Sequence, residues 1–271
     1  MEKGMKKIVL FDMDGTLTPP RKEFDVDLLP ALRELAKVAD IGIVTGSDHN
    51  YVLQQMGLLM NSSELRYKLH ILPCNGTKYY PPPTSATHKH ELVFEKNMRE
   101  ELGELQFTTI MQYLIRRQAL LHLFNIPMTG HFIDYRGSMI NWCPIGRNAN
   151  EEDRRRFIEF DRTSSCLFRE EEVVGFNKFL KNQHMFNNLQ IKLGGETSFD
   201  IYPKGWDKTF ALKHFEDYEH WFVGDRCGPR GNDQEIYEKL RVHGRAFEIK
   251  TTKETLSLIF DEIIPRIAND R

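Results

Sequence analysis

The 271-residue sequence has few cysteines and no long apolar run. Its four cysteines form no CxxC pair, which argues against a zinc site or a disulfide framework and favours a reducing compartment. No segment reaches the roughly 18 apolar residues that a membrane helix needs. The first apolar run stops at Asp12, too early for a signal peptide. These absences predict a soluble, cytoplasmic protein without a membrane partner.

The sequence also lacks an excess of either charge, because its formal net charge is only −2. A chain without a strong field of one sign is not expected to recruit nucleic acid or an anionic membrane surface. Its length and its 40% hydrophobic content allow one large domain or two smaller ones, each with a real core.

What the sequence contains is an alternation of short apolar runs and amphipathic segments. Buried parallel strands are predicted at 8–11 and 41–44 and in the segments HILPCNG and HWFVGD. Helical patterns follow at about 27–39 and after TGSD. This alternation predicts an α/β fold with a doubly wound, Rossmann-like parallel sheet.

The alternation stops at three consecutive prolines, 81–83, and returns only at GWDKTFALKHF. The stretch between contains a long helical pattern at about 98–124, a hairpin turning at Arg136–Gly137, and a helix that begins in NANEEDRRRFIEF. We therefore expect a core formed by 1–83 and 205–271, interrupted by an inserted α+β domain at 84–204.

Carboxylates follow two of the predicted strands. Asp12 and Asp14 share one side of the chain at the end of the first strand, and Asp225 ends HWFVGD. The carboxyl ends of parallel strands form the edge where ligands bind in open α/β sheets. Asp12 and Asp14 alone could be a solvated strand end, but three converging carboxylates would repel one another unless they held a cation such as Mg²⁺. Such an ion would attract a phosphate.

Four stretches, DMDGT, TGSD, the lysine of GWDK, and GDRCGPRGND, resemble the motifs of the haloacid dehalogenase superfamily of phosphotransferases. This resemblance implies that Asp12 is the nucleophile that forms an aspartyl-phosphate and that Asp14 is the general acid and base. Ser47 would bind the phosphoryl oxygens, which is compatible with its serving as a helix N-cap. Lys208 would neutralise charge between nucleophile and phosphate, although an exposed helix lysine is the alternative.

The same resemblance implies a metal site and its surroundings. Mg²⁺ would be held by the side chains of Asp12 and Asp225 and by the main-chain carbonyl of Asp14. Asn232 and Asp233 would support these ligands.

The inserted segment narrows the resemblance further. FIDYRGSMINWCPIGRNANEEDR, GGETSFDIYPKGWDK and PPRKEFD resemble the eukaryotic-type (α) phosphomannomutases, and the match runs in order from about residue 8 to 237. The resemblance implies an enzyme that interconverts mannose 6-phosphate and mannose 1-phosphate and could also use glucose phosphates. Its product would be the precursor for GDP-mannose synthesis. The resemblance also implies a hexose 1,6-bisphosphate intermediate and activator, an inserted segment acting as a substrate-binding cap, and a homodimer formed through this cap.

Six residues of these matching stretches would bind substrate. A clamp on the second phosphate suits arginine, whose fork binds phosphate bidentately and never loses its charge. By motif match the clamp consists of Arg21, Arg136, Arg147 and Arg154, while Ser198 and Asp200 bind sugar hydroxyls. Arg136 could instead be an exposed turn residue, and Arg154 could belong to a solvated, salt-bridged helix face.

Two departures from the family pattern affect these expectations. Thr45 stands where family members usually have glycine, beside the expected phosphate site. Lys239 stands where they carry an aspartate for a second, structural cation, so that second ion is not expected here. The alternatives to a mutase are a Mg²⁺-dependent sugar-phosphate phosphatase with the same motifs and a non-catalytic sugar-phosphate-binding protein.

Overall fold

The computed structural model describes residues 5–19, 22–163, 167–182 and 188–269. The chain divides into two compact units, the first comprising Met1–Glu95 and Gly205–Arg271 and the second Lys96–Lys204. Among the described residues no helix is long and apolar enough to cross a membrane.

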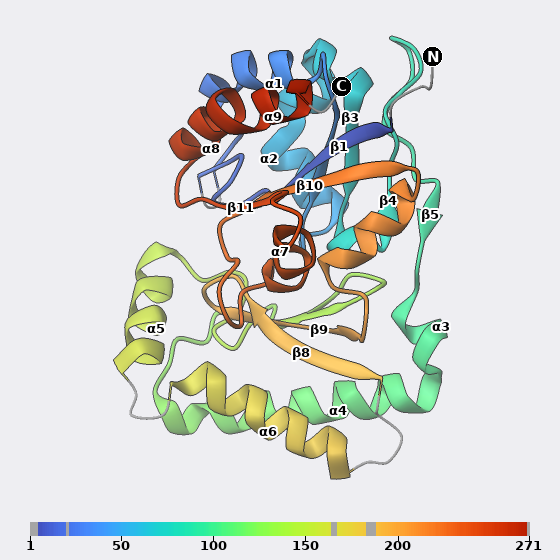
Figure 1. The fold of residues 1–271 in the computed structure, drawn as a ribbon. Coiled ribbons are helices and arrows are strands. Elements are labelled where there is room, and N and C mark those ends of the chain that lie inside the picture. Colours follow the sequence, from blue (N-terminus) through green and yellow to red (C-terminus); the bar gives the residue numbers. More distant parts are fainter. Residues whose placement is uncertain (1–4, 20–21, 164–166, 183–187, 270–271) are drawn as a thin grey trace. The chain divides into compact units, whose positions relative to one another are not determined.

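The first unit is built on a five-stranded parallel sheet with the order β11-β10-β1-β2-β3, in which β1 and β10 lie side by side (Figure 1). Its strands are β1 (Lys6–Phe11), β2 (Asp40–Val44), β3 (Leu69–Leu72), β10 (Tyr218–Gly224) and β11 (Ala246–Glu248). The central strand β1 is a short apolar run because both of its faces are buried.

Helices cover both faces of this sheet. Val9 and Phe11 of β1 belong to a core on one face, formed with α1 (Leu29–Leu35), α2 (His49–Ser62), α8 (Thr252–Leu258), a π-helical turn (Ile259–Ile263) and α9 (Ile264–Asn269). Ile8 and Leu10 point to the other face and pack against the 3₁₀ helix η5 (Lys208–Phe215) and α7 (Gln234–Arg241). The prediction of a doubly wound α/β sheet is confirmed.

The second unit contains an antiparallel sheet with the order β6-β7-β9-β8. Its strands are β6 (Ile133–Tyr135), β7 (Ile140–Trp142), β8 (Leu189–Gly194) and β9 (Ser198–Pro203), and its helices are α3 (Met98–Leu102), α4 (Glu104–Leu120), a 3₁₀ turn (Leu121–Phe124), α5 (Glu151–Thr163) and α6 (Phe168–Asn182). An α+β segment therefore interrupts the α/β core, as the sequence predicts, and the hairpin turns at Arg136–Gly137 as expected.

Two expected boundaries differ from the structure. The units divide after Glu95 rather than after residue 83, because β5 (Phe94–Glu95) pairs with β4 (Lys78–Tyr79) and keeps the intervening prolines within the first unit. The expected single helix at 98–124 is interrupted at Gly103, which has a φ of 76° that ends α3 before α4 begins.

Candidate active site

The candidate active site of the first unit begins where two neighbouring strands end. β1 and β10 pair in parallel with Phe11 opposite Val223, and the backbone N–H of Asp12 donates to the carbonyl of Val223 at 2.9 Å. Asp12 is therefore the first residue past β1, and Asp225 follows directly after β10. The expectation that these two carboxylates share one sheet edge is confirmed.

Lys208 lies inside this site and is only 1% exposed. It opens η5, whose N-cap Asp207 accepts from the backbone N–H of Thr209 at 2.9 Å. The Lys208 Nζ donates to Asp12 Oδ1 and, at 2.5 Å, to Asp233 Oδ1. An exposed helix lysine, the alternative considered from the sequence, does not fit this burial.

Three carboxylates surround one point at this edge. Oxygens of Asp12, Asp225 and Asp233 all lie within 4.8 Å of one another. Asp233 is thus a member of the acidic cluster itself, whereas the sequence analysis gave it a supporting position beside Asn232. The cluster contains no side-chain oxygen of Asp14, whose expected contribution was its main-chain carbonyl.

The donor set of this cluster fits a hard divalent cation. Asp225 Oδ1, a member of the cluster, is buried and has no hydrogen-bond partner among the described residues; the same is true of Oδ1 of Asn232, the residue that precedes Asp233 in the sequence. A buried polar oxygen without a partner is costly, so a cation contacting it would stabilise the site. Carboxylate and amide oxygens are the ligands that Mg²⁺ and Ca²⁺ prefer.

Burial and neighbouring charges shift the pKa values of the groups in this cluster. Burial raises the pKa of Asp12 well above its ordinary value, and the charges of Asp233 and Asp225 add to this against the opposing effect of Lys208. Burial, followed by the charge of Asp233, raises the pKa of Asp225 to about 6. Burial disfavours the charged form of Lys208, but the two adjacent carboxylates outweigh it and raise the pKa of Lys208.

Two glycines, Gly15 and Gly224, allow the backbone to lie close to the carboxylates of Asp225 and Asp233. Gly15 has a φ of 88°, and a Cβ there would collide with the carboxylate of Asp225. A Cβ on Gly224 would lie 2.6 Å from Asp233 Oδ2. These contacts explain why glycine follows Asp14 in the first motif and precedes Asp225 in the last.

Asp14 lies beside the cluster in a half-buried turn. The turn is closed by a hydrogen bond from the Gly15 N–H to the Thr18 carbonyl at 2.8 Å. The Tyr51 hydroxyl, from the first turn of α2, donates to Asp14 Oδ1 at 3.3 Å. Tyr51 is a contact that the sequence analysis missed, since one tyrosine in an amphipathic helix gives no signal for it.

Ser47 lies in the turn between β2 and α2. Its backbone N–H donates to Thr45 Oγ1 at 3.1 Å, and its carbonyl accepts from the Cys74 N–H at 2.9 Å. The N-cap of α2 is Asp48, which accepts from the Tyr51 N–H, so the expectation that Ser47 could itself be the N-cap is wrong. The hydroxyl of Thr45, where glycine was expected, thus holds the Ser47 backbone.

The second unit gathers two of the predicted arginines around one acid. The Nε of Arg136 lies 3.0 Å from Asp134 Oδ2, and the Nε of Arg147 lies 3.8 Å from the same oxygen. Arg136 is 8% exposed, which excludes the exposed turn residue considered as an alternative. Burial, and next the nearby charge of Arg136, lower the pKa of Arg147.

Asn141 connects Ser198 and Asp200 to Arg147 by hydrogen bonds. Asn141 is opposite Asp200 in the β7–β9 register, and its Nδ2 donates to Asp200 Oδ1 at 2.7 Å and to Ser198 Oγ at 3.0 Å. Its Oδ1 accepts from Arg147 Nη1 at 2.8 Å. Four predicted substrate residues, Arg136, Arg147, Ser198 and Asp200, therefore form one network. Asn141 and Asp134, which link it, were missed, although their strand alternation was a usable signal.

The other two predicted arginines, Arg154 and Arg21, are not part of the hydrogen bonds described for this network. Arg154 turns away from the acidic start of α5, because its Nη1 donates to Thr197 Oγ1 at 3.0 Å and its Nη2 lies 3.5 Å from Glu196. With only 13% of its side chain exposed, it is not on a solvated helix face. Arg21 lies outside the described residues.

Comparisons with known structures show the class of fold. The chain is similar to the IMP-bound, N-terminally truncated IMP-nucleotidase of Plasmodium falciparum, with a TM-score of 0.62, 14% identity, and coverage of 95% of this chain and 68% of that one. It is also similar to trehalose-6-phosphate phosphatase of Aspergillus fumigatus, with a TM-score of 0.51, 15% identity, and coverage of 97% and 93%. The fold is that of the haloacid dehalogenase-like proteins.

Sequence comparison shows the family. A family model described as eukaryotic phosphomannomutase matches residues 28–263. The chain is 35% identical to a phosphomannomutase of Dendrobium officinale over 239 residues, covering 88% of this chain and 87% of the relative. It is 36% identical to one from Arabidopsis thaliana over 242 residues, covering 88% and 90%. The chain belongs to the eukaryotic phosphomannomutase family.

Proposed function

We propose that this protein is a phosphomannomutase that interconverts mannose 6-phosphate and mannose 1-phosphate and so supplies the precursor of GDP-mannose. Family membership supports the proposal, and one observation carries it. Lys208 is buried between the carboxylates of Asp12 and Asp233 at the carboxyl edge of the sheet. A buried cation between acids suits phosphoryl transfer, because it restrains a carboxylate nucleophile and offsets phosphate charge.

In this proposal the core unit transfers the phosphoryl group. A carboxylate oxygen of Asp12 attacks phosphorus, the bond from phosphorus to the sugar oxygen breaks, and Asp14 gives its proton to that oxygen. In the return half-reaction Asp14 takes the proton from the sugar hydroxyl that attacks the aspartyl-phosphate. Lys208 and Ser47 bind the phosphoryl oxygens, and Lys208 keeps Asp12 in position.

The acidic cluster supports a role for Mg²⁺ in this chemistry. Asp12, Asp225 and Asp233 would hold the ion, with Asn232 beside them, and the ion would supply charge neutralisation at the transferring phosphoryl group. The main-chain carbonyl of Asp14 stays a predicted ligand.

The second unit is proposed as the substrate-binding cap. Arg136, Arg147 and Arg154, together with Arg21, would hold the phosphate that is not reacting, while Ser198 and Asp200 bind sugar hydroxyls. The network through Asn141 supports this assignment, because it already aligns two cationic groups with hydroxyl-binding oxygens. A mutase needs such a second phosphate site, since its intermediate is a hexose 1,6-bisphosphate. Glucose phosphates, which differ by one hydroxyl orientation, are proposed as further substrates.

A coupled assay separates the mutase from the phosphatase alternative. Purified protein is given mannose 1-phosphate with Mg²⁺, with and without a hexose 1,6-bisphosphate, and both mannose 6-phosphate and inorganic phosphate are measured. We expect isomer formation that depends on the bisphosphate and is lost in chelator, with little phosphate released. Asp12→Asn should remove this activity, whereas Asp27→Asn, at an exposed position, should not. Stoichiometric phosphate release without isomer would refute the mutase and support the phosphatase.

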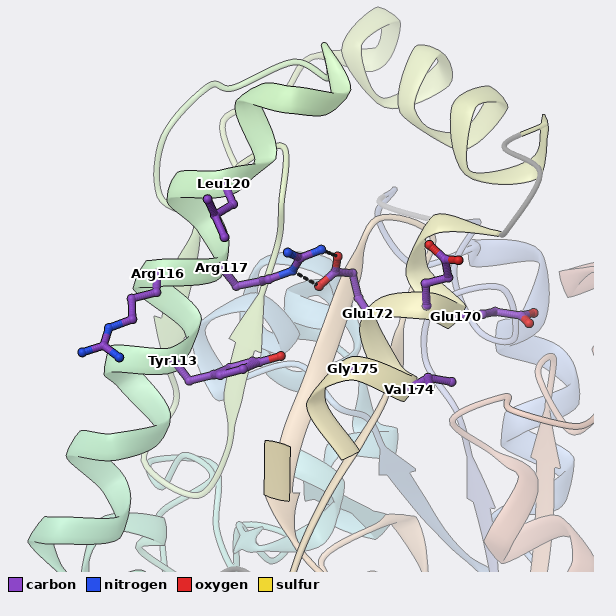
Figure 2. A pocket seen from close by; sticks show the side chains of 9 residues that line it. Tyr113, Arg116, Arg117, Leu120, Glu170, Glu172, Val174 and Gly175 are labelled. Carbon is purple, nitrogen blue, oxygen red and sulfur yellow. Dashed lines mark hydrogen bonds and ion pairs between the residues drawn. The ribbon is translucent and has the colours of Figure 1, made fainter. Parts of the chain in front are cut away.

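A homodimer formed through the second unit is also proposed. A cavity of about 800 Å³ lies between α4 and α6, and Figure 2 shows Arg117 paired with Glu172 inside it. Val174 of α6 and Leu120 of α4 line the cavity and are 67% and 47% exposed. Arginines on one helix and glutamates on the other make this surface complementary to itself, as a two-fold contact requires.

The cytoplasm is the proposed location of the protein. Cys74, Cys143 and Cys227 are buried free thiols, which is consistent with a reducing compartment.

A further inference from the structure

The turn that joins β8 to β9 lies next to the predicted substrate residues of the second unit. Ser198 begins β9, and its hydroxyl donates to the carbonyl of Gly194 at 2.6 Å. A Cβ on Gly194 would lie 2.8 Å from Asp200 Oδ2, so the two ends of the turn are in close contact. Any displacement of this turn therefore moves Ser198 and Asp200.

Two arginines from two helices hold the turn. Arg154 of α5 donates to Thr197 Oγ1 at 3.0 Å. Arg169, at the start of α6, donates from Nη1 to the carbonyl of Gly195 at 3.1 Å. Gly195 has a φ of 54°, a left-handed backbone conformation that residues with side chains rarely adopt. The hydrogen bond from Arg169 therefore holds the turn at a residue with a specific backbone conformation.

Arg169 is itself fixed by Asp161, near the end of α5. Asp161 Oδ2 accepts from Arg169 Nε at 2.7 Å, and its Oδ1 accepts from the Arg169 backbone N–H at 2.8 Å. The side chains are 13% and 12% exposed, so water competes weakly for this pair. One carboxylate thus fixes both the backbone and the guanidinium of the residue that holds Gly195.

We propose that Asp161 and Arg169 are positioning residues for substrate binding. They hold the β8–β9 turn so that Ser198, Asp200 and Arg154 keep the arrangement that receives the sugar phosphate. This inference rests on the proposed function and extends it to two residues that touch neither the reacting atoms nor the predicted hydroxyl contacts. Their action is confined to the second unit, so it affects recognition of the sugar and not the phosphoryl-transfer chemistry of the core.

The test compares two substrates in the same variants. Arg169→Gln and Asp161→Asn should raise the KM for mannose 1-phosphate by about tenfold or more, because small misplacements of binding groups are costly. Hydrolysis of a small aryl phosphate, which needs no sugar contact, should stay within about twofold of wild type. Arg169→Lys keeps the charge but not the fork and should give an intermediate KM.

Two controls distinguish positioning from a loss of stability. Arg162→Gln removes an exposed arginine one residue from Asp161 and should leave both activities unchanged. Phe157→Leu loosens the α5 core, where Phe157 is fully buried, and should lower the melting temperature without changing the KM. Hydrogen exchange in residues 194–198 should rise in Arg169→Gln and not in Phe157→Leu.

The outcomes separate the two proposals. An unchanged KM in Arg169→Gln, or equal losses on the sugar phosphate and the aryl phosphate, would overturn the positioning role while leaving the mutase intact. A wild-type protein that converts no hexose phosphate would overturn the proposed function and the positioning role together.

Discussion

Removing the charge of Lys208 should damage both activity and stability. In Lys208→Met the side chain keeps its approximate length but no longer offsets the carboxylates of Asp12 and Asp233. Oxygens of the clustered carboxylates lie within 4.8 Å of one another, and two unit charges at that distance repel by about 3.5 kcal/mol at an effective dielectric constant of about 20. Without a cation, this repulsion acts between buried groups that have little access to solvent.

The expected loss in the free energy of unfolding depends on how completely Lys208 is buried. Breaking a buried ion pair by removing one partner costs about 3–5 kcal/mol, and Lys208 is 1% exposed, so a loss of this size in the free energy of unfolding is expected without divalent cation. Added Mg²⁺ should restore part of it, because the ion supplies positive charge to the same carboxylates. Mutase activity should fall by about 10²–10³-fold, since removing one group that stabilises charge at the reacting centre costs this much.

Urea unfolding with and without Mg²⁺, together with the coupled mutase assay, measures these effects. Lys213→Met is the matched control, because Lys213 lies on the same 3₁₀ helix but is exposed. It should change stability by less than about 0.5 kcal/mol and leave activity intact. If Lys208→Met kept a tenth of wild-type activity, or if the control were equally damaged, the assigned role of the buried ammonium would be refuted.

Two further predictions concern acid stability and assembly. Burial lowers the pKa of His70 to about 4, so below pH 6.5 the unfolded chain binds a proton that the folded chain does not bind, and the free energy of unfolding should fall by about 2.5 kcal/mol between pH 7 and 4.5. In urea unfolding at a series of pH values, His70→Gln should reduce this fall, whereas His88→Gln, at an exposed position, should not. Identical pH profiles for the two variants would contradict the reasoning. In sedimentation velocity, Val174→Glu should convert a dimer of the 31.8 kDa chain into monomer. Val242→Glu, at an exposed position of the first unit, should leave the dimer intact. A monomeric wild-type protein, or a Val174→Glu variant that stays dimeric, would refute the proposed dimer surface.

The sheet and its two leading carboxylates could be predicted because they depend on local patterns. A short apolar run bounded by turn residues defines a buried parallel strand, and the residue after it must lie at the carboxyl edge. Asp12 and Asp225 were placed together on this basis, and β1 and β10 are indeed neighbours. The same patterns could not place the division after Glu95, because the two-residue strands β4 and β5 are too short to give a periodic signal.

The position of Asp233 depends on a loop conformation that no periodic pattern encodes. The backbone of Asp233 donates to the Arg226 carbonyl at 3.2 Å, and its side chain accepts from the Arg226 N–H at 3.1 Å. Gly231 permits this folding, because any Cβ there would overlap the Arg226 carbonyl. The loop therefore returns Asp233 to the end of β10, close to Asp225. Sequence reasoning identified Asp233 as a nearby residue but could not show that it faces Lys208.

The charge balance of the site connects these features. When ionised, the three carboxylates and the one ammonium carry a net charge of −2 in a buried site. Burial raises the pKa values of Asp12 and Asp225, and the charges of the neighbouring carboxylates add to this effect. One divalent cation would neutralise this net charge, whereas a second lysine could not. The fully buried Lys208 is therefore a fixed part of the site. The buried Asp225 Oδ1, which has no hydrogen-bond partner among the described residues, supports the proposal that a cation binds at this edge. In the proposed reaction a substrate phosphate adds negative charge again, and the hydroxyl of Ser47 alone would not offset it. We therefore expect a bound metal ion and Lys208 to act together at the transferring group.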